Sequence, residues 1–349
     1  MIRFAWRQFR LQALVVSGLL VAVAVILLFT GPHMAHVFDT TVKHCKSKGD
    51  CSFVKNSLIS QNHKIYQFLQ SLSLVFPALI GIFWGAPLIA REFETGTYRL
   101  AWSQGVTRSK WIVTKLAAVG VASMIVTGLL SWMLTWWASP IDTLNADRFN
   151  SLVYDTHYIA PIGYAIFAFA VGVTAGVLWR RTLPAMATTL VVYVAARITF
   201  TQKVRPHLLT PLKVTTKLLK SSGYGFEQTP NGLHFIVSTG YSPNALVFNS
   251  VMVGKHGAKV TAQWLKANCA NLLIRHPPVS GNGGVRVKGT APKAFTECVD
   301  KIAANFHQVL TYQPANRFWT FQWLEGSIYL AAGVALCAFS YWWLRRRVA

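Results

Sequence analysis

The chain has 349 residues, of which 53% are hydrophobic, and its 34 Lys and Arg against 11 Asp and Glu give a formal net charge of +23. Together with a mean hydropathy of +0.37, this composition fits a polytopic membrane protein. We expect the excess positive charge to face lipid headgroups or other surface polyanions, and we expect no nucleic-acid partner.

Six hydrophobic runs are long enough to cross a bilayer. A hydrocarbon core about 30 Å thick needs roughly 20 apolar residues in a helix, because backbone polar groups in lipid must be satisfied within the segment. The first run is too long for a secretory signal and has no cleavage site after it, so we interpret it as a retained helix. Only the fifth contains a charge, Arg197, whose side chain we expect to extend to the interface. The runs are Leu11–Gly31, Leu72–Ala90, Leu116–Trp137, Tyr158–Trp179, Leu183–Thr201 and Gly326–Leu344.

Basic residues near the ends of these runs predict their orientation. They concentrate before the first run, after the second, after the fourth and after the sixth, and these positions share one side if both termini are cytoplasmic. The residues are Arg3, Arg7, Arg10, Arg91, Arg99, Arg108, Lys110, Lys115, Arg180, Arg181, Arg345, Arg346 and Arg347. The first ten residues also place aromatic side chains among three arginines, which predicts a cytoplasmic interfacial helix over residues 1–10.

The remaining segments between the spans are predicted to be extracellular, chiefly a loop over 32–71 and a larger domain over 202–321. The sixth span and a cytoplasmic tail are predicted to follow over 322–349. The larger segment has 14 Lys and Arg against three acids. This surface would suit anionic lipid heads or wall polymers, and a solvated face without a ligand is equally compatible. Strands are predicted at Leu233–Thr239 and Gly284–Gly289, and helices at Lys259–Ile274 and Ala291–Leu310. The fold class is therefore an all-α polytopic membrane protein with six transmembrane helices and a small α+β extracellular domain between spans five and six.

Four of the five cysteines fall in these predicted extracellular segments. An oxidising compartment favours disulfides Cys45–Cys51 and Cys269–Cys298, although four cysteines permit three connectivities. A metal site would enlist His33, His36 and His44 beside the first pair. No zinc-type spacing is present, so we expect no metal.

The chain returns to the membrane through an aromatic stretch that ends at Glu325. Ring bodies with polar edges suit the boundary between water and lipid, so we predict that Phe318, Trp319 and Trp323 anchor the interface beside Arg317. Glu325 would then mark the start of the last helix, where the helix dipole favours an acid. A substrate gate is the alternative interpretation of this stretch.

The segment 91–115, REFETGTYRLAWSQGVTRSKWIVTK, is the most informative part of the chain. A short polar connection between two spans is too small for a catalytic domain, and it carries Glu92 and Glu94, which suggests a docking surface. We expect the second helix to continue to Thr95 and to end at Gly96. A short helix over residues 97–104 would follow, ending at Gly105, and Thr107 would cap the third span. The alternative is a basic loop that only fixes topology.

This segment resembles the permease subunits of ABC-2-type exporters, in the form found in actinobacteria. Those proteins share an acidic pair, Gly-Thr, a leucine, then Ser or Thr with Arg, and a lysine at the third span. The corresponding residues and neighbours expected to dock an ATPase are Arg91, Glu92, Glu94, Gly96, Thr97, Tyr98, Arg99, Leu100, Trp102, Gly105 and Arg108. The stretch Gln313–Gln322 is similar as well.

The resemblance implies a multi-pass permease of the bacterial plasma membrane. It would pair with a second permease chain, alike or different, contact membrane lipids, and bind a separate cytoplasmic ABC ATPase. The chain has no G-x-x-x-x-G-K-[ST] loop, so it is not expected to be an enzyme or to hold a cofactor, and ATP and Mg would lie on the partner. The implied function is export of an amphipathic drug, antimicrobial peptide or lipid.

Two further expectations separate this function from others. An ion-driven carrier ordinarily needs an ionisable residue within the membrane, and the spans are predicted to contain none at mid-depth. His157 and His207 are expected at the surface, which argues against an enzyme site. The remaining alternative is a non-transporting sensor or display protein that presents the basic extracellular domain.

Overall fold

The computed structural model describes residues 2–42, 52–96, 107–145, 147–217, 224–229, 232–237, 244–254, 257–269 and 293–347. The chain forms two compact units. One is helical and comprises Met1–Leu208 with Phe318–Ala349, and the other is Leu209–Arg317. The second unit is therefore shorter at both ends than the predicted domain 202–321.

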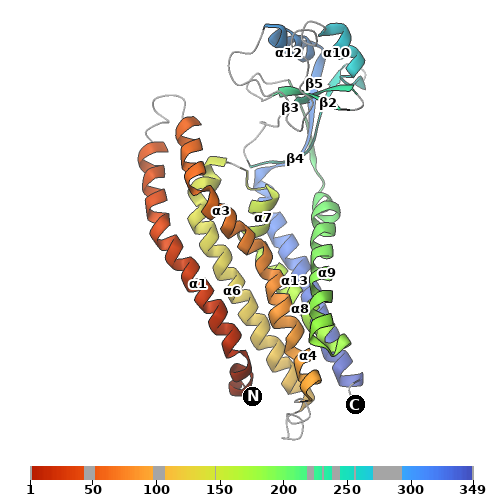
Figure 1. Ribbon diagram of the computed structural model, residues 1–349. Coiled ribbons are helices and arrows are strands. Elements are labelled where there is room, and N and C mark those ends of the chain that lie inside the picture. The colour runs from red at the N-terminus through yellow and green to blue at the C-terminus, as the bar shows by residue number, and fades with distance from the viewer. Residues whose placement is uncertain are drawn as a thin grey trace. The chain divides into compact units, whose positions relative to one another are not determined.

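The helical unit is built from long helices that run alongside one another (Figure 1). Six candidate spans lie within the described residues, as the hydropathy of the sequence predicts. The first helix begins and the last helix ends at the same end of this unit. The elements are α1 (Ile2–Val37), the π-helix η1 (Phe38–Val42), α3 (Ser52–Ile80), the π-helix η2 (Gly81–Gly85), α4 (Ala86–Thr95), α6 (Arg108–Asn145), α7 (Ser151–Thr156), α8 (Ala160–Trp179), α9 (Thr182–Thr199), η3 (Phe200–Val204), η4 (Arg205–His207) and α13 (Phe318–Arg347).

Several helices extend beyond the apolar runs from which they were predicted. The predicted loop over 32–71 is largely helical, because α1 continues to Val37 and α3 already begins at Ser52. The amino-terminal residues are continuous with α1, so no separate interfacial helix is formed there. Hydropathy detects only the part of a helix that needs lipid, and polar residues continue a helix in water without an apolar pattern.

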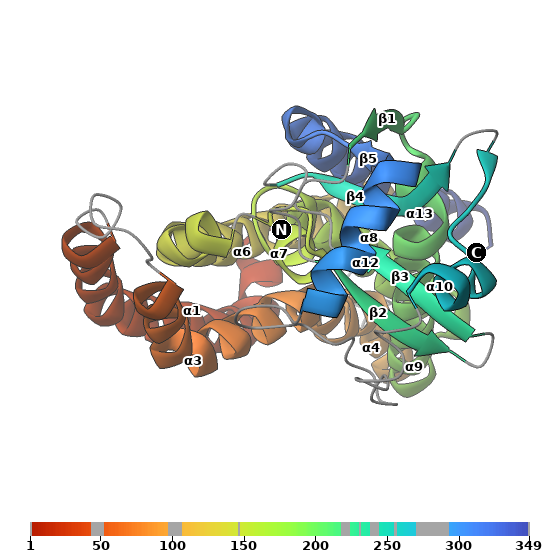
Figure 2. The same ribbon diagram turned by 90° about the horizontal axis from the view of Figure 1, so that it is seen from above.

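Helix α8 lies among the other helices, whereas α1 lies at the margin of the unit (Figure 2). In their most apolar stretches, 78% of the α8 residues are buried but only 11% of those in α1. Glycines allow the chain from α3 to α4 to approach α8 closely. A Cβ atom added at Gly172 would lie 2.3 Å from the carbonyl oxygen of Gly81, and one added at Gly176 would lie 2.6 Å from that of Ala86. This contact requires the absence of side chains on α8.

The second unit contains a sheet of three antiparallel strands in the order β1 (Leu212–Thr216), β5 (Phe306–Gln313) and β4 (Leu246–Gly254). Leu212 pairs with Tyr312, and β4 has a bulge between Val247 and Asn249. A separate hairpin pairs β2 (Tyr224–Thr229) with β3 (Gly232–Val237), and β3 overlaps the strand predicted at Leu233–Thr239. The described residues of this unit also form helices α10 (Ala262–Asn268) and α12 (Lys293–Asn305).

The predicted helix over 291–310 is wrong at its carboxyl end. From Phe306 onward the chain alternates buried and more exposed side chains and forms β5 between two partner strands. Alternation with period two suits a strand, and the sheet supplies hydrogen bonds along both edges. The predicted strand at Gly284–Gly289 and the end of the predicted helix beyond Cys269 lie outside the described residues.

Cys269 and Cys298 form the predicted disulfide, with their Cα atoms 5.3 Å apart. Both are buried in the core of the second unit beside Leu265, Phe295 and Ile302. The bond joins the residue after α10 to the middle of α12. Cys45 and Cys51 lie outside the described residues, and Cys337 is free and packs against the helical core.

We predict that Cys269 and Cys298 will not react with maleimide until a reductant is added, because the bond leaves no thiol. Mass spectrometry of the alkylated, digested chain would measure this. Cys337 provides the internal control, since its free thiol should react in denaturant without reduction. Labelling of both Cys269 and Cys298 before reduction would contradict the disulfide.

Candidate functional site

The end of α4 has the geometry that the sequence predicts. The helix closes at Thr95, and Gly96 adopts a left-handed conformation with a φ of 69°. That conformation is strained for residues with a Cβ atom, so glycine ends the helix here. On the far side of the segment, the backbone N–H of Lys110 donates to Thr107 Oγ1 at 3.4 Å, which caps α6.

Glu92 and Glu94 lie on this last part of α4 and make contacts within the chain. Glu92 is only 7% exposed and forms an ion pair with Lys115 of α6. Glu94 accepts two hydrogen bonds from Thr182 at the start of α9, from the backbone N–H at 2.9 Å and from the hydroxyl at 2.5 Å. Glu92 is therefore not displayed to a partner in this structure, which corrects that part of the expectation.

The other predicted docking residues fall into two groups. Arg91 is exposed, and Arg108 is the first residue of α6. The remaining positions, where the short helix was expected, lie outside the described residues: Thr97, Tyr98, Arg99, Leu100, Trp102 and Gly105.

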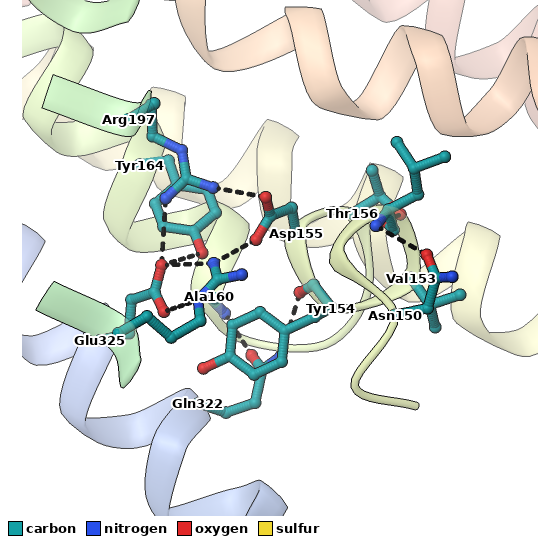
Figure 3. Close-up of polar contacts among 12 residues, drawn as sticks. Asn150, Val153, Tyr154, Asp155, Thr156, Ala160, Tyr164, Arg197, Gln322 and Glu325 are labelled. Carbon is teal, nitrogen blue, oxygen red and sulfur yellow. Dashed lines mark hydrogen bonds and ion pairs between the residues drawn. The ribbon is translucent and has the colours of Figure 1, made fainter. Parts of the chain in front are cut away.

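A cluster of four buried charged side chains joins α7, α9, η4 and α13 (Figure 3). Its acids are Asp155 of α7 and Glu325 of α13, and its bases are Arg197 of α9 and Arg205 of η4. Arg197 donates to Asp155 at 2.9 Å and to Glu325 at 3.0 Å. Arg205 donates to Glu325 through Nε and Nη2, both at 2.9 Å, and also pairs with Asp155.

Aromatic residues enclose this charge cluster. Tyr164 of α8 donates a hydrogen bond to Glu325 at 2.7 Å, and the Arg197 guanidinium lies 3.6 Å from the centre of the same ring. The guanidinium of Arg205 lies 4.2 Å from the ring centre of Tyr154. Two acids and two bases leave the cluster neutral, and each charge has several partners. Such pairing is what a buried charge needs in a low-dielectric interior.

This arrangement corrects two expectations. Arg197 is 8% exposed and paired, so it does not extend to an interface. Glu325 is fully buried and stands two turns inside α13, so it does not begin the helix. Arg197 and Glu325 thus lie within candidate spans as buried ionisable residues, and the expectation that no ionisable residue lies at mid-depth stays a prediction.

His157 is also buried rather than at the surface, while His207 is exposed. The Nε2 atom of His157 lies 3.4 Å from Oδ2 of Asp142. The other carboxylate oxygen of Asp142, Oδ1, accepts a hydrogen bond from the Tyr66 hydroxyl at 2.8 Å. Burial lowers the pKa of His157, and the nearby carboxylate opposes this shift. The ring therefore favours its neutral form more than a solvated histidine does.

The aromatic side chains at the start of α13 differ in exposure. Phe318 is 2% exposed and packs against Phe149 and Tyr158, so it is a core residue rather than an anchor. Trp319 and Trp323 are 47% and 59% exposed. Arg317 donates to the carbonyl oxygen of Thr210 and to Gln313, both at 2.8 Å.

Comparison with known protein families bears on this architecture. A family model described as ABC-2 membrane transporter related matches residues 17–205, more than half of the chain. The chain belongs to this family. No curated protein and no solved structure matches it. Members of this family are membrane components of transporters and generally have no ATPase site of their own. Membership in the family implies that the chain associates with an ABC ATPase.

In this ABC-2-related protein, the match begins within the first candidate span, continues into the fifth and ends at Arg205. It includes the acidic pair of α4 and three members of the charge cluster, whereas Glu325 comes from outside the matched region. The cluster could not be recognised in the sequence because its members are far apart in the chain. Arg197, a charged residue within an apolar run, was the one indication of the cluster in the sequence, because such residues usually pair inside a helical bundle.

Proposed function

We propose that the chain is the permease subunit of an ABC exporter in the bacterial plasma membrane, with both termini cytoplasmic. A separate ATPase would bind below the membrane at the segment around 91–108, and its ATP hydrolysis would drive export of an amphipathic drug, antimicrobial peptide or lipid. A second permease chain would complete the path. The unit Leu209–Arg317 would then lie outside the cell.

The segment between α4 and α6 carries this proposal. It lies within the family match and connects two candidate spans. The end of α4 and the start of α6, which flank it, lie at the end of the helical unit where α1 begins and α13 ends (Figure 1). The basic residues of the sequence favour the cytoplasm for that end. The disulfide of the second unit supports an oxidising compartment for the other side.

Copurification with defined variants would test the proposal. The tagged full chain is purified in mild detergent from its own bacterial membrane, and the ratio of ABC ATPase to permease is measured by mass spectrometry. We expect a stoichiometric ATPase with its own G-x-x-x-x-G-K-[ST] loop. The double variant Arg99→Ala, Trp102→Ala should lower that ratio at least tenfold, because two side chains of the docking segment are lost.

Trp323→Ala provides the control, since Trp323 is an exposed tryptophan of α13 far along the chain from the docking segment. It should leave the ratio unchanged. Absence of an ATPase from the unmodified protein would favour the sensor or display function. Labelling of an Arg99→Cys variant in intact cells by a membrane-impermeant maleimide would place the segment outside and overturn the proposal.

A further inference from the structure

The two acids of α4 face different helices. Residues two positions apart in a helix lie on nearly opposite sides of it. Glu92 accordingly pairs with Lys115 of α6, and Glu94 accepts from Thr182 of α9. One turn of α4 thus makes side-chain contacts to two separate candidate spans.

The contact at α9 replaces an ordinary helix cap. Arg181 occupies the N-cap position and makes no side-chain capping bond of its own. Glu94 instead satisfies the first N–H group of the helix and the hydroxyl of the same threonine, with oxygen distances of 2.9 and 2.5 Å. An acid is also favoured by the positive end of the helix dipole. The start of α9 is therefore capped by a residue 88 positions earlier in the chain.

The contact at α6 is buried. The side chains of Lys115 and Glu92 are 5% and 9% exposed, and the lysine ammonium also lies 4.9 Å from the ring centre of Trp111. A buried ion pair is costly to break on one side, because the remaining charge stays without a partner. On its third side, α4 is in close backbone contact with α8 at Gly176.

We infer that Glu92 and Glu94 are positioning residues for transport, which hold the end of α4 to α6 and α9 and do not contact the ATPase. The inference rests on the proposed function. Residues 97–106 follow directly on this turn, so a displacement imposed on them by an ATPase would move the third and fifth spans together. Loss of either contact should then weaken coupling while the ATPase stays bound.

The decisive test for Glu92 is a charge exchange. Glu92→Lys should lower the maximal permease-dependent ATP turnover of the purified complex in lipid nanodiscs at least fivefold, with the KM for ATP and the bound ATPase unchanged. The double variant Glu92→Lys, Lys115→Glu should restore at least half of the lost turnover, because it recreates the ion pair in reverse. A residue that contacted the ATPase would not be rescued by a change within the permease.

The test for Glu94 uses its threonine partner. Thr182→Val removes the hydroxyl donor, whereas Thr182→Ser keeps both donors. We expect at least a threefold loss of coupled turnover in the first and none in the second, and faster hydrogen exchange in the first turn of α9 in the valine variant. Thr188→Val is the matched control, because that hydroxyl donates only to Pro184 of its own helix.

Two results would overturn the inference while leaving the proposed function intact. One is loss of the ATPase from Glu92→Lys without rescue by the exchange, and the other is unchanged turnover in both Glu92→Lys and Thr182→Val. Absence of an ATPase from the unmodified protein would overturn the proposed function together with the inference.

Discussion

Replacing Glu325 by glutamine is expected to lower the free energy of unfolding by about 3–5 kcal/mol, which is the usual cost of breaking a buried ion pair on one side. Glu325 is fully buried and accepts from Arg197, Arg205 and Tyr164. Its neutral replacement would leave two buried guanidinium groups with one carboxylate, that of Asp155. Unfolding in detergent, followed by tryptophan fluorescence, would measure the change.

Two companion variants make this result specific to charge balance. Glu297→Gln, at an exposed position of α12, should change stability by no more than about 0.5 kcal/mol. Combining Glu325→Gln with Arg205→Met should recover more than half of the loss, because Arg197 and Asp155 then remain as a neutral pair at 2.9 Å. A Glu325→Gln variant as stable as the Glu297→Gln control would show that the cluster contributes little to folding.

Replacing Gly172 by alanine should prevent the helical unit from packing as it does. The added Cβ atom would lie 2.3 Å from the carbonyl oxygen of Gly81 and 2.7 Å from the backbone nitrogen of Ala86. Backbone atoms cannot rotate away as a side chain does, so the helices must separate. Overpacking a core typically costs about 1–3 kcal/mol, and we expect the upper part of that range or more here.

Gly18 of α1 is the matched control for this substitution, because a Cβ atom added there meets no atom within 4 Å. Gly18→Ala should be neutral or stabilising by up to about 1 kcal/mol through helix propensity. The two variants would be compared by the fraction of detergent-solubilised protein that elutes as a monodisperse peak in size-exclusion chromatography. Their free energies of unfolding in detergent would also be compared. Equal stability of both variants would contradict the close contact between α3–α4 and α8.

Local patterns in the sequence predicted the parts of the fold that depend on local physics. The apolar runs identified six spans, Gly96 ended α4, and Thr107 capped α6. Each of these depends on residues that are close together in the chain. The disulfide Cys269–Cys298 was predicted because its cysteines lie together in one predicted extracellular segment, an argument of compartment rather than of geometry.

Long-range pairing explains most of what the sequence did not show. Arg197 meets Glu325 across 128 positions, and Glu94 meets Thr182 across 88. From the sequence alone, an arginine near a span end is equally compatible with an interface and with a buried partner. The same holds for Glu92, whose burial depends on the position of Lys115 on another helix. The role of the segment in binding an ATPase stays a prediction.

The charge cluster also has a consequence for biogenesis. Glu325 is synthesised 128 residues after Arg197 and 120 after Arg205. At about 5–20 residues per second, roughly 6–26 s of translation separate these residues. During that interval, of the two acids that will surround the arginines, only Asp155 has been made. A nascent or truncated chain that lacks its last helix therefore has two arginines in the fifth candidate span and only Asp155 to balance them, and uncompensated charge is costly in lipid. Completion of the final helix neutralises that charge.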